Sequence, residues 1–201
     1  MLRAIFLNFI AREKCYNNTL IMEKKNGPWT IKETRQIYKN EFLELFEDKV
    51  VQPDGKDGEY ATVRMKAGVC TLAIDEENNV YLTRQFRYAL GAESLEVIAG
   101  GMDEGSPLDN AKREAREEMG IEAEEWIDLG TAETDTSIVR SKAHFFIARK
   151  LKFTEPEREG TEAMKPAKMS FDEALEKVLS GEIKHALSCL LILKAKMKLR
   201  D

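Results

Sequence analysis

Residues 95–121 read LEVIAGGMDEGSPLDNAKREAREEMGI, and the fold prediction for the whole chain starts from this stretch. It predicts a short apolar strand, a glycine-rich turn and a helix over 107–119. Ser106 is the expected N-cap, and Asp109 three residues later completes a capping box. Gly120 is expected to end the helix in the left-handed conformation.

The predicted helix carries three carboxylates. Glu114, Glu117 and Glu118 stand at i, i+3 and i+4, so their side chains are neighbours on the helix surface. The helical repeat places Glu118 beside the apolar stripe, Glu114 next to it and Glu117 further toward solvent. Arg113 is expected to pair with Glu117 at i+4. The apolar stripe consists of Leu108, Ala111, Ala115 and Met119.

Such a cluster of charges can be interpreted in two ways. A run of charges on a helix is commonly a solvated face. A hard divalent cation, however, prefers oxygen ligands and would bind where carboxylates gather. The Gly100-Gly101 turn brings backbone close to the start of the same helix. We therefore predict a metal site at the edge of the buried face.

The segment 113–121, REAREEMGI, resembles the second half of the Nudix box, the signature of hydrolases that split nucleoside diphosphates linked to another group. The first half departs from the family pattern, because one residue and the early glutamate are missing. The resemblance implies an α+β fold, namely a Nudix-type α/β/α sandwich around a mixed sheet, with a small N-terminal antiparallel β region.

Two further segments, YLTRQFR (81–87) and LEVIAG (95–100), resemble the ADP-ribose and nucleoside diphosphate sugar pyrophosphatase branch of that family. The resemblance implies that Mg²⁺ or Mn²⁺ is bound by the Ala99 carbonyl, Glu114 and Glu118. It implies a catalytic Glu162 that orients or deprotonates the attacking water. The remaining implied site residues are Glu117 and Arg113 in catalysis, and Arg87, Glu96, Trp29 and Arg140 in substrate binding.

Several of these roles have structural alternatives. Arg87 and Arg140 offer the bidentate fork that suits phosphate, but either could instead pair with an acid. Trp29 could stack on a base or pack in the hydrophobic interior. Glu162 could be one more acid in a polar loop.

The resemblance implies metal-dependent hydrolysis of the pyrophosphate bond of ADP-ribose or ADP-sugars, giving a nucleoside monophosphate and a sugar phosphate. Two alternatives remain open. One is a non-catalytic Nudix-fold module that binds ADP-ribose-like ligands, and the other is a Nudix hydrolase of dinucleoside polyphosphates.

Composition limits the possible partners. The chain has 201 residues, 43% of them hydrophobic and 33% charged, which is typical of a globular protein. A net charge of −5 argues against nonspecific binding to nucleic acid. The three cysteines are widely spaced and form neither a disulfide framework nor a zinc motif, so we expect a cytoplasmic protein.

The sequence predicts three regions. Residues 1–27 are an N-terminal extension, either an amphipathic helix or dispensable, and too short to span a membrane. The run 23–28 at its end predicts a linker. Residues 28–66 form the β region, which is expected to mediate a homodimer, and 67–201 form the Nudix hydrolase domain. Two helices are expected in the last region, over 171–179 with Ser170 as N-cap and over 185–199 with Leu187, Leu190, Leu191 and Leu193 inward.

Overall fold

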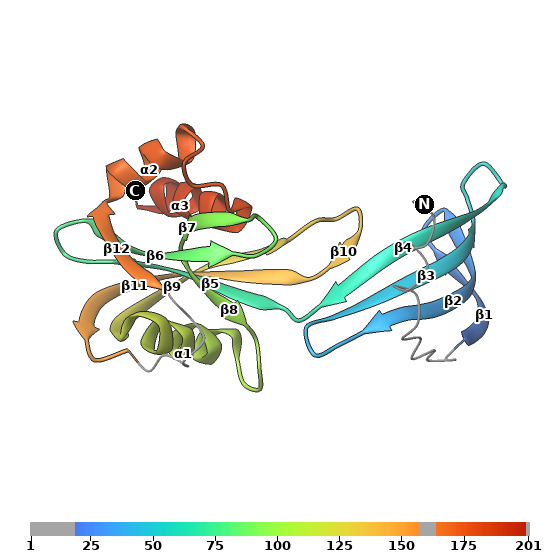
Figure 1. Cartoon of the computed structure of the whole chain (residues 1–201), viewed down its shortest axis with the longest axis horizontal. Coiled ribbons are helices and arrows are strands. Elements are labelled where there is room, and N and C mark those ends of the chain that lie inside the picture. Colours follow the sequence, from blue (N-terminus) through green and yellow to red (C-terminus); the bar gives the residue numbers. More distant parts are fainter. Residues whose placement is uncertain (1–18, 157–163, 200–201) are drawn as a thin grey trace, which may run out of the picture. The chain divides into compact units, whose positions relative to one another are not determined.

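A computed structural model describes residues 19–156 and 164–199. The chain divides into two compact units (Figure 1). Unit 1 comprises Met1–Met65 and Thr136–Arg140, and unit 2 comprises Lys66–Asp135 and Ser141–Asp201. Each unit is described by itself below.

Unit 1 is a five-stranded sheet in the order β1-β2-β3-β4-β10. The first four strands run antiparallel to their neighbours, and β10 pairs in parallel with β4. The strands are β1 (Thr19–Asn26), β2 (Trp29–Lys39), β3 (Leu43–Val51), β4 (Asp57–Met65) and β10 (Val139–Arg140).

Strand β1 corrects the prediction of a linker over 23–28. Lys24, Lys25 and Asn26 pair with the start of β2, so most of the proposed linker is an edge strand. Its polar composition was misleading, because an edge strand is held by backbone hydrogen bonds to one neighbour and needs little apolar pattern. The preceding part of the extension, residues 1–18, lies outside the described residues.

Unit 2 contains a seven-stranded mixed sheet in the order β12-β6-β5-β11-β9, with β7 paired to β6 and β8 paired to β5. Strand β11 runs parallel to β5 and antiparallel to β9. The strands are β5 (Gly68–Ile74), β6 (Asn79–Arg87), β7 (Ala92–Glu96), β8 (Ile98–Gly101), β9 (Ile121–Glu133), β11 (Lys142–Phe153) and β12 (Lys165–Ser170). The helices are α1 (Pro107–Met119), α2 (Phe171–Leu179) and α3 (Ala186–Lys198).

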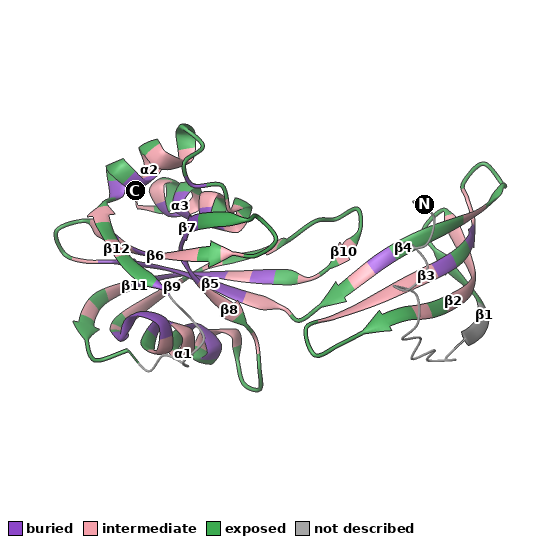
Figure 2. Ribbon diagram, viewed as in Figure 1, coloured by how far each residue is buried: buried purple, intermediate pink, exposed green. Residues whose placement is uncertain are grey.

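The central strand β5 of this sheet is buried along almost its whole length (Figure 2). Alternate residues of a strand point to opposite faces. On β5, Leu72 and Ile74 pack in a cluster with residues of α2 and α3, whereas Ala73 packs in a second cluster with Ala115 and Met119 of α1. The helices therefore cover opposite faces, which confirms the predicted α/β/α sandwich.

Helix α1 has the predicted caps. The Ser106 hydroxyl accepts the N–H of Asp109, the Asp109 carboxylate accepts the N–H of Ser106, and Gly120 adopts φ +62°. Helix α2 has the predicted N-cap as well, since the Ser170 hydroxyl accepts the N–H of Glu173.

The orientation predicted for the last helix is partly wrong. Leu191 is buried, but Leu190 and Leu193 are 37% and 40% exposed. The buried face instead contains Ser188, Leu191, Ile192 and Ala195. Apolar residues occur all around this helix, so the sequence pattern could not identify the face that meets the sheet. No helix in the described ranges is long and apolar enough to cross a membrane.

Candidate active site

Arg113 on α1 connects the acidic side chains of its own helix to the preceding turn. Its Nη2 lies 2.7 Å from Glu114 Oε1, and its Nη1 lies 2.7 Å from Glu117 Oε2. Nη2 also donates to the carbonyl oxygen of Gly101 at 3.2 Å. Burial alone would lower the pKa of Arg113, but the charges of Glu114 and Glu117 raise it. The guanidinium is thus a permanent cation between two carboxylates and the end of β8.

The carboxylate of Glu114 lies directly over β8. A Cβ atom on Gly100 would be 2.1 Å from Cδ and 2.2 Å from Oε1 of Glu114. Any other residue at position 100 would force the carboxylate end of Glu114 to shift, because real Cβ atoms do not approach other atoms so closely. The glycine-rich turn of the sequence therefore makes the close approach of carboxylate and backbone possible.

The three glutamates differ in burial in the predicted order. Glu118 is 5% exposed, whereas the side chains of Glu114 and Glu117 are 12% and 34% exposed. This confirms that Glu118 adjoins the apolar stripe and that Glu117 lies nearest to solvent. A buried carboxylate loses solvation, so its presence here favours a polar or cationic partner.

The donor set at this site fits a hard divalent cation. Glu118 and Glu114 offer carboxylate oxygens, and Ala99 beside Gly100 on β8 offers a backbone carbonyl, which is the oxygen chemistry that such ions take. Within the described residues, no three acidic, histidine or cysteine side chains form a ready-made metal cluster. A bound ion would compete with Arg113 for the carboxylate of Glu114.

Arg87 and Glu96, both predicted to bind substrate, form an ion pair on the adjacent strands β6 and β7. Arg87 Nε donates to Glu96 Oε1 at 3.0 Å, and Nη2 donates to Oε2 at 2.5 Å. Glu96 is only 2% exposed. Burial by itself would raise the pKa of Glu96, but hydrogen bonds from Arg87 and Ser94 bring it below its ordinary value. Glu96 therefore remains an anion that orients Arg87.

The thiol of Cys70 is affected both by the charge of Glu96 in this ion pair and by the charge of Glu118 in the acidic cluster. Cys70 lies opposite Ala99 in the β5–β8 register. Burial, together with the charges of Glu96 and Glu118, raises the pKa of the Cys70 thiol to about 12. The thiol is neutral at physiological pH and is not a nucleophile, and it lies within electrostatic reach of both carboxylates.

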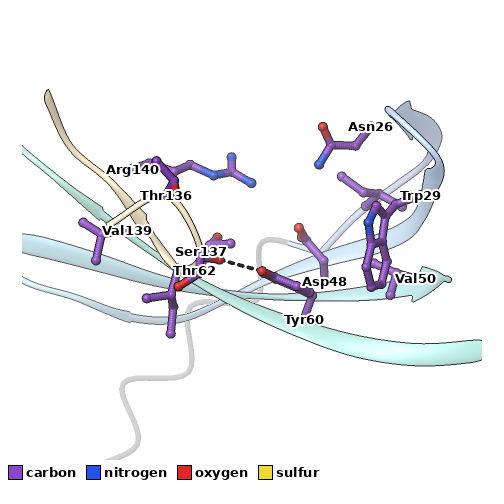
Figure 3. A pocket seen from close by; sticks show the side chains of 12 residues that line it. Asn26, Trp29, Asp48, Val50, Tyr60, Thr62, Thr136, Ser137, Val139 and Arg140 are labelled. Carbon is purple, nitrogen blue, oxygen red and sulfur yellow. Dashed lines mark hydrogen bonds between the residues drawn. The ribbon is translucent and has the colours of Figure 1, made fainter. Parts of the chain in front are cut away.

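Two other predicted binding residues line one pocket of unit 1. Trp29 and Arg140 contribute to a cavity of about 240 Å³, shown in Figure 3. Trp29 meets Tyr60 edge to face, with ring centroids 5.5 Å apart. Asp48 is buried and accepts a hydrogen bond from Thr34 at 2.6 Å. The pocket thus combines an aromatic wall with a carboxylate and a guanidinium.

Glu162, the predicted residue for activating water, lies outside the described residues. The structure also brings His185 to Glu96 and Ser188 to His185 and the backbone of Val97, which the sequence did not indicate. They are separated from Glu96 by about ninety positions, and no local motif connects them.

Comparison with known proteins identifies the family of the chain. Residues 64–187 match the NUDIX domain, and residues 29–63 match the nucleoside diphosphate sugar hydrolase N-terminal domain. An ADP-ribose pyrophosphatase of Bacillus subtilis (strain 168) is 27% identical over 81% of this chain and 90% of its own length. A methanol dehydrogenase activator of Bacillus methanolicus is 30% identical over 77% of this chain and 84% of its own length.

Structural similarity agrees with the sequence matches. A crystal structure of an ADP compounds hydrolase superimposes with a TM-score of 0.76 and covers 88% of this chain and 97% of its own. Its sequence is 17% identical, so it supports the fold alone.

Proposed function

This chain belongs to the NUDIX family, and we propose that it hydrolyses the pyrophosphate bond of nucleoside diphosphate sugars, with ADP-ribose or an ADP-sugar as substrate. The products are a nucleoside monophosphate and a sugar phosphate. The observation that carries this proposal is the cluster on α1, where Glu114 lies against Gly100 and Glu118 is buried beside it. The N-terminal domain match and the ADP-ribose pyrophosphatase relatives support the substrate class.

The reaction has an electrostatic requirement. The pyrophosphate carries negative charge at the bond to be cut, and this charge repels a nucleophilic water. In our proposal Glu114, Glu118 and the Ala99 carbonyl hold Mg²⁺ or Mn²⁺, with Glu117 at the outer side of the cluster. The chemistry that such an ion supplies is neutralisation of phosphate charge and a lower pKa for the attacking water.

The chain's own side chains provide orientation and proton transfer. Arg113 acts as a positioning residue, because it holds Glu114 and Glu117 in fixed places relative to the end of β8. Arg87 binds a phosphate oxygen through its guanidinium, whose orientation is set by the bidentate contact with Glu96. Glu162 accepts the proton of the attacking water or orients it.

Trp29 and Arg140, which line the same pocket, are proposed to bind the substrate. Trp29 offers a ring face for a base, and Arg140 offers a guanidinium for an anionic or carbonyl oxygen in the same pocket.

We also propose a homodimer that resides in the cytoplasm. In unit 1 the strand residues Ile37, Tyr38 and Met65 and the turn residue Phe42 are exposed, and exposed large apolar side chains favour a protein–protein contact. Free thiols at Cys70 and Cys189 are consistent with a reducing compartment.

A product analysis tests the proposed function. Purified protein is incubated with ADP-ribose, other nucleoside diphosphate sugars and dinucleoside polyphosphates, each with Mg²⁺ and with Mn²⁺. We expect AMP and ribose 5-phosphate from ADP-ribose as the fastest reaction. Tight binding of ADP-ribose with no product would instead indicate a non-catalytic module, and faster cleavage of a dinucleoside polyphosphate would indicate a different Nudix substrate class.

A further inference from the structure

Two side chains at the start of α3 reach the strand that carries Glu96. His185 is the N-cap residue of α3, and its Nδ1 lies 3.4 Å from Glu96 Oε2. The same Nδ1 shares a hydrogen bond of 2.8 Å with the hydroxyl of Ser188, which is fully buried. The Ser188 hydroxyl also accepts the backbone N–H of Val97 at 3.0 Å. One helix end thus contacts both the Glu96 carboxylate and the backbone of the next residue.

The contact falls where the chain changes its sheet partner. Strand β7 ends at Glu96 and pairs with β6, whereas β8 begins at Ile98 and pairs with β5. The backbone N–H of Val97 lies at this break, and Val97 is fully buried. A buried N–H needs a hydrogen-bond partner, and here Ser188 supplies it. Ala99, whose carbonyl belongs to the proposed metal site, follows two residues later.

Glu96, which His185 contacts, in turn orients Arg87. Its two oxygens bind Nε and Nη2, so the carboxylate fixes the plane of the guanidinium and not merely its position. A guanidinium that is already oriented loses less side-chain freedom when it binds a ligand. The orientation of Glu96 therefore sets the direction in which Arg87 presents its other N–H groups.

We propose that His185 and Ser188 are positioning residues of the hydrolase, which hold Glu96 so that Arg87 is oriented to bind a substrate phosphate. This inference rests on the proposed function, and in particular on the role of Arg87. The competing explanation is that the same contacts only attach α3 to the sheet. Leu191, Ile192 and Ala195 of α3 are fully buried in the core, so the helix has an attachment that does not need the His185 side chain.

The test is a thermodynamic cycle on ligand binding. The Kd for ADP-ribose is measured by calorimetry with EDTA present, so that metal-dependent turnover does not contribute. We use the full chain and the variants His185→Ala, Arg87→Ala and the double variant. A charged hydrogen bond lost in Arg87→Ala should weaken binding by roughly 10- to 100-fold. His185→Ala should weaken it several-fold, and the double variant should bind like Arg87→Ala alone, because His185 acts through Arg87.

Three further variants serve as controls for an unspecific loss of affinity. His185→Asn retains a hydrogen-bonding group near Nδ1 and should restore most of the affinity. Lys184→Ala, at the exposed preceding residue, should bind like the parent protein. Ser188→Ala should weaken binding and also lower the melting temperature, because the N–H of Val97 loses its partner.

The outcomes separate the inference from the function on which it rests. Parent-like binding by His185→Ala, or losses that add to that of Arg87→Ala, would overturn the inference while leaving the phosphate role of Arg87 intact. Parent-like binding by Arg87→Ala would overturn both. Cleavage of ADP-ribose in the product analysis tests the proposed function independently of either result.

Discussion

Glu114 on helix α1 lies so close to Gly100 on strand β8 that a methyl group on residue 100 would be 2.1 Å from the carboxylate carbon. The side chain of one element thus occupies the space that any other residue would fill on the second. The absence of a Cβ at residue 100 allows the proposed ligand Glu114 to lie close to the strand that carries the Ala99 carbonyl. This close approach gives a physical reason for glycine at this point of the turn.

Gly100→Ala should therefore reduce catalysis without unfolding the protein. The new methyl group displaces Glu114, and a misplacement of this size typically lowers kcat by about 100-fold. Gly101→Ala is the matched control, since a Cβ there meets nothing within 4 Å and the carbonyl that binds Arg113 is retained. Steady-state kinetics and melting temperatures of both variants check this. Equal activity of the two variants would show that the position of Glu114 is unimportant.

Glu118→Gln should lower kcat strongly and leave the fold and the substrate affinity largely intact. The amide is nearly isosteric, so the buried site of Glu118 can retain its shape, but the charge that attracts a divalent ion is lost. We expect a loss of at least about 100-fold, equivalent to ~2.7 kcal/mol of transition-state stabilisation. Steady-state kinetics and circular dichroism of the variant provide the measurement. A variant as active as the parent would show that Glu118 is not part of the catalytic site.

Gly120→Ala should lower the free energy of unfolding of unit 2 by more than the cost of placing alanine in a left-handed backbone conformation. Gly120 has φ +62°, and a Cβ would lie 2.1 Å from the carbonyl oxygen of Thr154, whose N–H binds the Gly120 carbonyl at 2.7 Å. Gly130→Ala is the control, because Gly130 has φ +79° with open space around it. The positive φ costs roughly 1–2 kcal/mol in both variants, and the clash should add about 1–3 kcal/mol in Gly120→Ala only. Urea unfolding of the two variants measures the difference.

The pH dependence of stability should change when Arg87 is removed. The folded-state pKa of Glu96 lies below its unfolded value of about 4.3. Ionised Glu96 therefore contributes stability above that pH, and the contribution is lost as the pH falls through the lower, folded pKa. In Arg87→Ala the buried carboxylate of Glu96 loses its main partner, so the pKa of Glu96 rises. The loss in unfolding free energy of the variant is therefore largest at neutral pH. The difference in unfolding free energy between parent and variant should shrink from pH 7 to pH 4, and a constant difference would contradict this account.

Local sequence signals predicted the elements around α1 well. The capping box at Ser106, the left-handed Gly120 and the burial order of the three glutamates all depend on neighbours within one or two turns. Such interactions can be inferred from spacing alone. The i+4 contact of Arg113 with Glu117 belongs to the same class.

Features that depend on distant partners were not predicted. The short apolar strand expected before the glycine-rich turn is two strands, because β7 pairs with β6 and β8 pairs with β5 on either side of Val97. The contact of Glu96 with His185 joins segments far apart in the sequence. The inward face of α3 depends on its packing against the sheet and could not be read from a helix with leucines on several sides.

In the proposed reaction the carboxylates of α1 hold a divalent cation beside the scissile phosphate bond. The most direct measurement is the melting temperature of the parent protein and of Glu118→Gln as Mn²⁺ is titrated. A ligand that binds only the folded state stabilises it by about 2.7 kcal/mol at 100 times its Kd, so the parent should melt several degrees higher at saturation and Glu118→Gln should not respond. An unchanged melting temperature of the parent at saturating Mn²⁺, or the same rise in both proteins, would contradict the claim.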